Sequence, residues 1–218
     1  MSKKMMLLAL AAVTAALFAM PAAASAVEDT VHFENVTNFS GTSGAGSLAA
    51  EGEPTITCAS GAVSGALETG GTTGTISLQF FECHTTVFGF TAKCRTTGSE
   101  KDNTIKSTGS FHLITTEEGP KPAILVTTDT VTIVCAGISN TIVHGAVIGT
   151  ITSPKCGEES TSLTVAFAAS GTNQDHKLWT GVEYDLTATT GEGGSAKTAG
   201  LNSTGTVSSA SKGKLVCT

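Results

Sequence analysis

The segment from Val131 to Ile151 constrains the fold most, because apolar side chains recur there at every second position. Val131, Ile133 and Cys135 fall on one face of an extended chain. Further on, Ile142, His144, Ala146 and Ile148 share one face, and Val143, Val147 and Ile151 share the other. A period of two is the signature of β-strands, and residues 136–140 supply the Gly, Ser and Asn of a turn. We expect a central β-hairpin whose second strand is covered on both faces.

The rest of the chain also favours strands. Two further segments alternate clearly, one with Ile76, Leu78 and Phe80 and the other with Leu163, Val165 and Phe167. A break is expected near Thr128 and Asp129. We interpret the Gly-rich segments 40–54 and 189–203 as loops and residues 178–186 as a strand. Long helical patterns are absent. The sequence therefore predicts an all-β fold, an antiparallel β-sandwich or barrel of about ten to twelve strands stapled by disulfides.

The first 26 residues have the pattern of a secretory signal peptide. Lys3 and Lys4 precede an apolar run from Leu7 to Met20, and the small residues Ala24-Ser25-Ala26 follow. The apolar run is shorter than the ~20 residues that a membrane-spanning helix needs. We expect cleavage before Val27, leaving residues 27–218 as one secreted all-β domain in the extracellular medium or at the cell surface.

The charge of that domain argues against two classes of partner. Without Lys3 and Lys4, the chain's 12 basic residues become ten against 18 acidic ones, a formal charge of −8. Nucleic-acid binding requires a basic surface that meets phosphates, and docking on anionic lipid requires a similar one. We therefore expect no nucleic acid and no membrane as a partner after removal of the signal. The sequence does not indicate an oligomeric state.

Six cysteines lie in residues 27–218, an even number that indicates three disulfides in an exported chain. No C-x-x-C motif suggests a metal site, and no cofactor is expected. Cys83 and Cys94 flank a short connection between candidate strands, which predicts a bridge between them. Cys58 and Cys135 end two similar strands that we expect to lie side by side, which predicts a second bridge.

The two strands that end in Cys58 and Cys135 belong to a faint internal echo. Residues 55–83 and 132–156 share, in the same order, a strand with a cysteine, a Gly-Ala pair, a Gly-Thr-Ile motif and a second cysteine. Two interpretations stay open. The echo records the duplication of a β unit, or it arises by chance in a chain rich in Gly and Thr.

Part of the sequence resembles a family of uncharacterised secreted β proteins from soil actinobacteria. The resemblance covers roughly residues 55–180 and depends on the placement of Cys83, Cys94 and Cys135 and on the V-x-G-x-V-I-G motif at 143–149. It implies secretion and β architecture, and it carries no activity. Cys156 and Cys217 are additions to the shared pattern, and the resemblance implies that they pair with each other.

The densest mixture of aromatic and acidic side chains is formed by Trp179, Glu183, Tyr184 and Asp185. Three interpretations stay open. The two carboxyls form an acid–base pair for glycoside cleavage, the four residues form a sugar-binding edge, or Trp179 packs in the core. The nucleophile and zinc-protease motifs G-x-S-x-G and H-E-x-x-H are absent, and the histidines at 84, 112 and 144 fit packed or surface positions on strands.

These observations favour a secreted, non-catalytic β protein with a structural or interaction role, whose partner is a surface polymer or a protein. The alternative is a polysaccharide- or cell-wall-binding module that uses the Trp179 region. A secreted glycoside hydrolase is the less favoured third possibility.

Overall fold

The computed structural model describes residues 31–99, 101–117, 121–136, 139–191 and 193–218. The expected signal peptide and its cleavage site lie outside the described residues. Across the part that is described, the regular structure consists of strands only, and every pairing between strands is antiparallel. The prediction of an all-β, antiparallel, disulfide-stapled fold is confirmed. The large sheet has 14 strands where ten to twelve were expected.

The strands are β1 His32–Glu34, β2 Asn38–Ser43, β3 Gly46–Ala50, β4 Ile56–Cys58, β5 Ser60–Leu67, β6 Thr73–Phe81, β7 His84–Val87, β8 Phe90–Thr96, β9 Thr104–Thr115, β10 Pro122–Cys135, β11 Ser139–Ser153, β12 Glu159–Phe167, β13 Ala169–Ser170, β14 Asn173–Gln174, β15 Leu178–Trp179, β16 Val182–Glu183, β17 Leu186–Thr190 and β18 Lys197–Val216.

The hydrogen-bonded ladders close on themselves twice. The first circuit runs through β2, β5, β6, β9, β10, β11, β12 and β18 and returns to β2. The second circuit runs through β10, β11, β17, β18, β3, β4, β7 and β8 and returns to β10. Strands β10, β11 and β18 belong to both circuits. They are also the three longest strands, with 14, 15 and 20 residues, because each pairs with different neighbours along its length.

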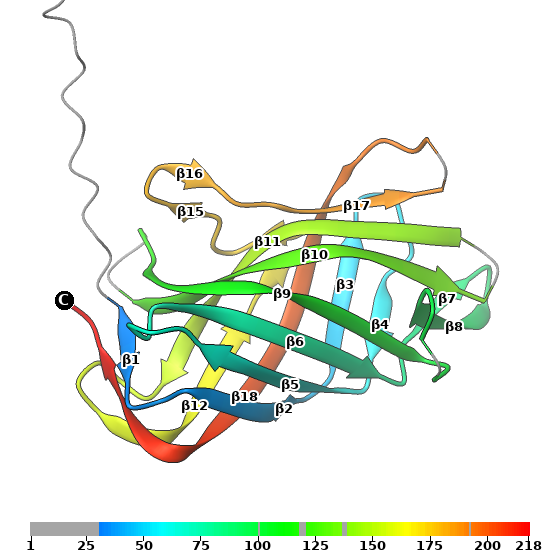
Figure 1. The fold of residues 1–218 in the computed structure, drawn as a ribbon. Helices are drawn as coiled ribbons and strands as arrows, with labels where there is room; N and C mark the ends of the chain where they lie inside the picture. Colours follow the sequence, from blue (N-terminus) through cyan, green and yellow to red (C-terminus); the bar gives the residue numbers. More distant parts are fainter. Residues whose placement is uncertain (1–30, 100, 118–120, 137–138, 192) are drawn as a thin grey trace, which may run out of the picture.

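Figure 1 shows how the circuits are arranged in space. Strands β2, β5, β6, β9, β10 and β11 form the near side, and β3, β12 and β18 cross behind them. The β7–β8 hairpin lies at the opposite end from the C-terminus. Both circuits therefore surround one interior, and β7–β8 stands at one end of it.

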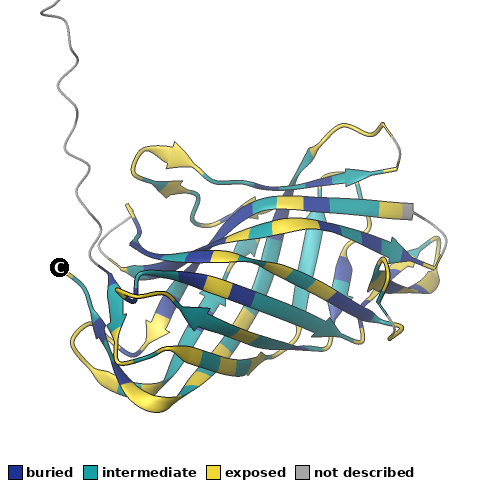
Figure 2. Cartoon of the chain, viewed as in Figure 1, coloured by how far each residue is buried: buried dark blue, intermediate teal, exposed yellow. Residues whose placement is uncertain are grey.

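The central hairpin predicted from sequence is β10 and β11. Their register pairs Thr132 with Ile142 and Val126 with Val147, and it shifts between Thr128 and Val131, where the break was expected. The inward side chains of Val143, Val147 and Ile151 join the main core, whereas Ala146 and Ile148 are buried in a second cluster on the outer face. The second strand is thus covered on both faces, as its sequence predicted (Figure 2).

The interpretation of the two Gly-rich segments as loops was wrong. Residues 40–54 contain most of β2 and all of β3, and β18 begins at Lys197 within the second segment. Small side chains suit these strands because the backbones approach closely. A Cβ atom at Gly41 would collide with the Thr206 carbonyl oxygen of the neighbouring strand β18. Glycine there makes close packing possible, which composition alone does not distinguish from a loop.

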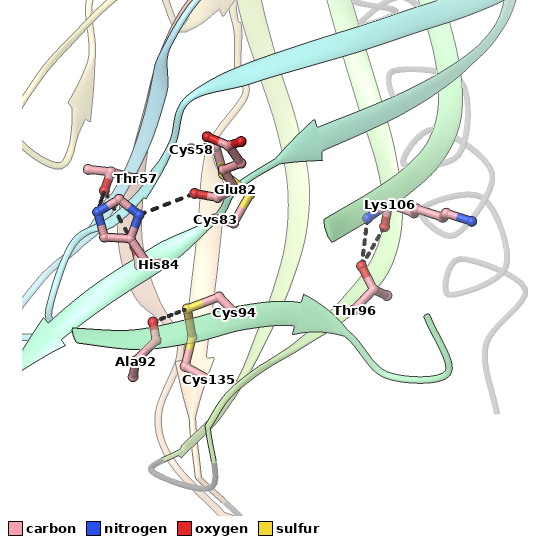
Figure 3. The surroundings of a disulfide bond; sticks show 10 residues. All are labelled: Thr57, Cys58, Glu82, Cys83, His84, Ala92, Cys94, Thr96, Lys106 and Cys135. Atoms are coloured by element: carbon pink, nitrogen blue, oxygen red, sulfur yellow. Dashed lines mark hydrogen bonds between the residues drawn. A yellow bond between two sulfur atoms is a disulfide. The ribbon is translucent and has the colours of Figure 1, made fainter. Parts of the chain in front are cut away.

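Four cysteines form a row across neighbouring strands, and the pairing predicted within this row was wrong. The disulfides are Cys58–Cys83 and Cys94–Cys135, each with 4.0 Å between Cα atoms. Cys94 and Cys135 are directly opposite each other on β8 and β10. The third disulfide, Cys156–Cys217, is the one that the resemblance implied. Figure 3 shows the two bridges of the row.

The geometry of antiparallel ladders explains the error. Cys83 and Cys94 are indeed neighbours, as predicted, and the Cys94 N–H donates to the Cys83 carbonyl over 2.9 Å. Residues joined by such a bond lie further apart than residues at a non-hydrogen-bonded position, where side chains meet more closely. Each sulfur therefore bonds to the cysteine on its other side. Cys58 and Cys135 stand at the two ends of the row.

Candidate functional site

The interior enclosed by the circuits contains an apolar cavity of about 200 Å³. Every strand of the first circuit contributes to its wall, and so do β3, β4 and β17 of the second. The alternating residues recognised in the sequence, which are Ile76, Leu78, Phe80, Leu163, Val165 and Phe167, all line it. None of the described residues in this wall is charged.

Much of this apolar wall is not fully packed. Ten apolar side chains of the wall lie against the buried core yet stay only half-buried: Phe33, Phe39, Leu48, Val63, Leu67, Leu78, Phe80, Leu163, Phe167 and Leu201. The interior of a closed sheet of about eight strands is either filled by side chains or wide enough for one small ligand. The half-buried wall and the cavity volume place this interior in the second category.

Hydroxyl side chains also line the cavity, at Ser43, Ser47, Ser107, Thr128, Ser160, Thr161, Ser162, Ser203, Ser208 and Ser209. Ser43 of β2, Ser47 of β3 and Ser203 of β18 line the cavity from three strands that are paired through β18. Each of the three side chains is half-buried. A serine hydroxyl both donates and accepts, so these three positions are suited to a neutral polar group on an otherwise apolar molecule.

A second cavity, of about 190 Å³, lies at the β7–β8 end. Ile56 of β4 lines both cavities. The wall of the second is more polar and includes Thr85, Thr141 and Thr190 together with Val87 at the end of β7. The buried Thr190 hydroxyl has no hydrogen-bond partner among the described residues.

The four residues singled out in the sequence lie on the outside of the sheet, around the β15–β16 hairpin. Trp179 packs on the outer cluster of Ile114, Ala123, Leu125, Ala146 and Ile148 together with Tyr184. Its ring is in edge-to-face contact with His112, with 4.7 Å between the ring centroids. The structure therefore brings Trp179 and Tyr184 together and half-buries both against the sheet.

The two acidic residues of this group share one cation. The Lys177 ammonium nitrogen lies 3.0 Å from an oxygen of Asp185 and 3.7 Å from one of Glu183. The strand expected over 178–186 is instead a tight hairpin that ends at Glu183, so that prediction was wrong. Glycine sets the path of the next segment. Gly145 has a φ of 117°, and a Cβ atom there would collide with the Asp185 carbonyl oxygen.

The histidines at 84 and 144 take part in strand-surface contacts. His84 Nε2 lies 3.1 Å from the Thr57 hydroxyl, and a His144 ring nitrogen lies 3.2 Å from the Thr187 hydroxyl. Both side chains are exposed on the sheet. These positions fit the packed or surface role that the sequence predicted.

Comparisons with protein-family models, with curated proteins and with solved structures find no match. No group of three or more His, Cys, Asp or Glu suited to a metal ion occurs within the described residues. The described part of the chain also contains no helix with the length and hydrophobicity of a membrane span. The three disulfides indicate an oxidising environment.

Sequence reasoning missed the cavity, although it identified much of the wall. The period of two tells which side chains share a face. It does not tell whether the facing side chains meet in the middle, because that depends on the width of the closed sheet.

Proposed function

We propose that this protein is a secreted, non-catalytic binding protein whose interior takes one small, neutral, mainly apolar molecule. The observation that carries the proposal is the cavity wall, in which apolar side chains are only half-buried. Burial of such side chains against a ligand is favourable by about 25 cal/mol for each Å² removed from water. Concave, mainly apolar sites with a few polar groups are typical of small-molecule binding.

The wall also indicates the chemical class of the ligand. An apolar cavity of about 150 Å³ is sufficient for benzene, so about 200 Å³ suits a molecule of one or two small rings. A charged ligand would be buried without a partner, because the described wall residues include no charged side chain. The hydroxyl side chains of the wall, among them Ser43, Ser47 and Ser203, favour a ligand that also carries a hydroxyl or carbonyl group.

The same wall supports binding and not turnover. General acid–base catalysis needs a titratable group within reach of the substrate, and the wall supplies apolar side chains and hydroxyls. The alternative site at Trp179 is less well supported. Its aromatic face is used in contacts with His112 and the outer cluster, and both carboxylates are paired with Lys177.

Secretion is part of the proposal. It is supported by the signal-like residues 1–26 and by three disulfides in the remainder of the chain. The location we propose is the cell surface or the medium.

A neutral fluorescent probe tests the interior site. 1-Naphthol, a neutral probe with two rings and one hydroxyl, should bind the chain from Val27 with a change in emission, and its anionic relative 1-naphthalenesulfonate should bind more weakly. Val63→Phe places a ring into the cavity and should weaken binding of the neutral probe by about tenfold or more. Ser64→Phe adds the same ring to the next position of β5, which is exposed, and should leave binding unchanged.

A cooperative thermal transition followed by circular dichroism is the check that each variant is folded. Equal probe binding by the wild type and a folded Val63→Phe variant would place the probe outside the cavity and refute the proposal. Tighter binding of the anionic probe would refute the neutral-ligand class.

A further inference from the structure

Two phenylalanines stand almost fully in solvent at the tip of the β7–β8 hairpin. Phe88 is 96% exposed and Phe90 is 76% exposed. The next most exposed large apolar residues among those described, Val182 and Leu178, reach 50% and 44%. Apolar side chains gathered at an exposed position mark a contact with another apolar surface.

The backbone at the tip shows that the fold does not require these rings. Val87 pairs with Phe90, so Phe88 and Gly89 form a two-residue turn, with φ values of 50° and 81°. Such turns prefer Asn, Asp or Gly at the first position, and a positive φ is unusual for a bulky residue. Phe88 therefore stands where local conformation disfavours it and where no packing in the described chain holds its ring.

The hairpin has a covalently fixed base. The cysteine row joins β7 to β4 through Cys83 and Cys58, and it joins β8 to β10 through Cys94 and Cys135. Cys83 and Cys94 are fully buried. The two rings are thus presented on a short hairpin whose strands are each anchored to the body of the protein.

The charge around this hairpin differs from that of the whole chain. Lys93 and Arg95 lie on the exposed face of β8, and Lys101 and Lys106 follow in the next segment, all four being exposed. They make up four of the ten basic residues of the chain from Val27. The same stretch contains three acidic residues, Glu82, Glu100 and Asp102, so residues 82–106 carry a formal charge of only +1. Asp102 lies 3.1 Å from the Arg95 guanidinium. The overall acidity that argued against anionic surfaces therefore does not extend to residues 82–106.

We propose that the tip of the β7–β8 hairpin docks on a lipid membrane surface that contains anionic headgroups. Phe88 and Phe90 enter the interface, and Lys93 and its basic neighbours face the headgroups. Phenylalanine rings bind at the boundary between headgroups and acyl chains, and each nearby Lys or Arg is attracted by the surface potential. A specific protein interface needs about 800 Å² on each partner, which two protruding rings do not provide.

The position of the hairpin links docking to the interior. Val87, next to Phe88, lines the second cavity, and Ile56 lines both that cavity and the apolar one. A lipid surface is also where neutral apolar molecules concentrate. Docking rests on its own observations, so its test is separate from that of the interior ligand.

Co-sedimentation of the chain from Val27 with vesicles tests the proposal. The wild type should bind phosphatidylcholine vesicles weakly and mixed phosphatidylcholine–phosphatidylglycerol vesicles more tightly. Phe88→Ser with Phe90→Ser should weaken binding to the mixed vesicles by about tenfold or more. Lys93→Glu should reduce binding to the mixed vesicles only. The matched control is Leu178→Ser with Val182→Ser, which removes exposed apolar groups from the other hairpin and should change nothing.

A tryptophan reporter gives a second measurement. In a Trp179→Phe background, Phe90→Trp places the only Trp at the tip, and its emission should shift to shorter wavelength on addition of mixed vesicles. Unchanged emission, or equal vesicle binding by the serine pair and the wild type, would overturn the proposal. A third outcome would also overturn the proposal. If the wild type forms a concentration-dependent dimer without lipid, and Phe88→Ser with Phe90→Ser abolishes that dimer, the rings contact a second copy of the chain.

Discussion

The β7–β8 and β15–β16 hairpins share a turn geometry and use it in opposite ways. Phe88-Gly89 has φ values of 50° and 81°, and Thr180-Gly181 has values of 51° and 73°. In the first hairpin the aromatic rings are exposed and cysteines fix the base. In the second, the aromatic ring of Trp179 packs against the outer face of the sheet.

The difference concerns what holds each hairpin in place. β15–β16 depends on its own side chains, through Trp179, Tyr184 and the ion pairs of Lys177. The β7–β8 hairpin is fixed at its base by the Cys58–Cys83 and Cys94–Cys135 disulfides, so its tip side chains are not needed for stability. A hairpin fixed at its base is free to present apolar groups to a partner, whereas a hairpin fixed by its aromatic ring is not.

The largest expected effect comes from opening the cysteine row. Cys94→Ala with Cys135→Ala should lower the free energy of unfolding by about 4 kcal/mol, because the bridge spans 41 residues and restricts the unfolded chain. Denaturant unfolding without reductant measures this loss. Hydrogen exchange of the β7–β8 amides should also accelerate, since β8 loses its anchor.

The control for this prediction is the third bridge. Cys156→Ala with Cys217→Ala opens a span of 61 residues and should cost a similar amount, about 4 kcal/mol. It should leave exchange at β7–β8 no faster than the general loss of stability explains. Equal local acceleration in both variants would show that the cysteine row has no special effect on the tip.

A smaller effect is expected at Trp179. Trp179→Ala should lower the free energy of unfolding by about 2 kcal/mol, less than for a fully buried Trp because the ring is only half-buried. Circular dichroism is the suitable probe, since the variant has no Trp for fluorescence. Phe88→Ala should cost nothing measurable. If Trp179→Ala is as stable as the wild type, the outer cluster does not hold β15–β16, and the contrast between the hairpins fails.

The smallest effect has the opposite sign. Phe88→Asn should raise the free energy of unfolding by about 1 kcal/mol, because Asn tolerates a positive φ better than Phe. Thr180→Asn occupies the same turn position in β15–β16 and should give a similar gain. Only Phe88→Asn should weaken vesicle binding. A loss of stability in Phe88→Asn would mean that the ring packs in the native state.

Sequence patterns predicted the strands well where polar and apolar residues alternate. The β10–β11 hairpin, its break near Thr128 and the double burial of β11 all followed from residues 123–151. Sequence patterns did not predict the strands that are built of small residues, as in β2, β3 and β18. Gly and Ser suit both turns and closely packed backbones. The single strand predicted over residues 178–186 was wrong for another reason. Thr180-Gly181 forms a turn, although apolar residues stand on both sides of it.

The amino-acid sequence by itself determined the class of fold, the number of disulfides and most of the side chains that face the interior. These follow from local periodicity and from cysteine content, which need no knowledge of neighbouring strands. The tertiary structure decided which cysteines bond, because that depends on the register between strands distant in sequence. It also decided that the interior is hollow and that Trp179 is packed while Phe88 is exposed. Those properties depend on how widely the circuits close and on what lies across from each ring, and neither is encoded in the spacing of residues along one strand.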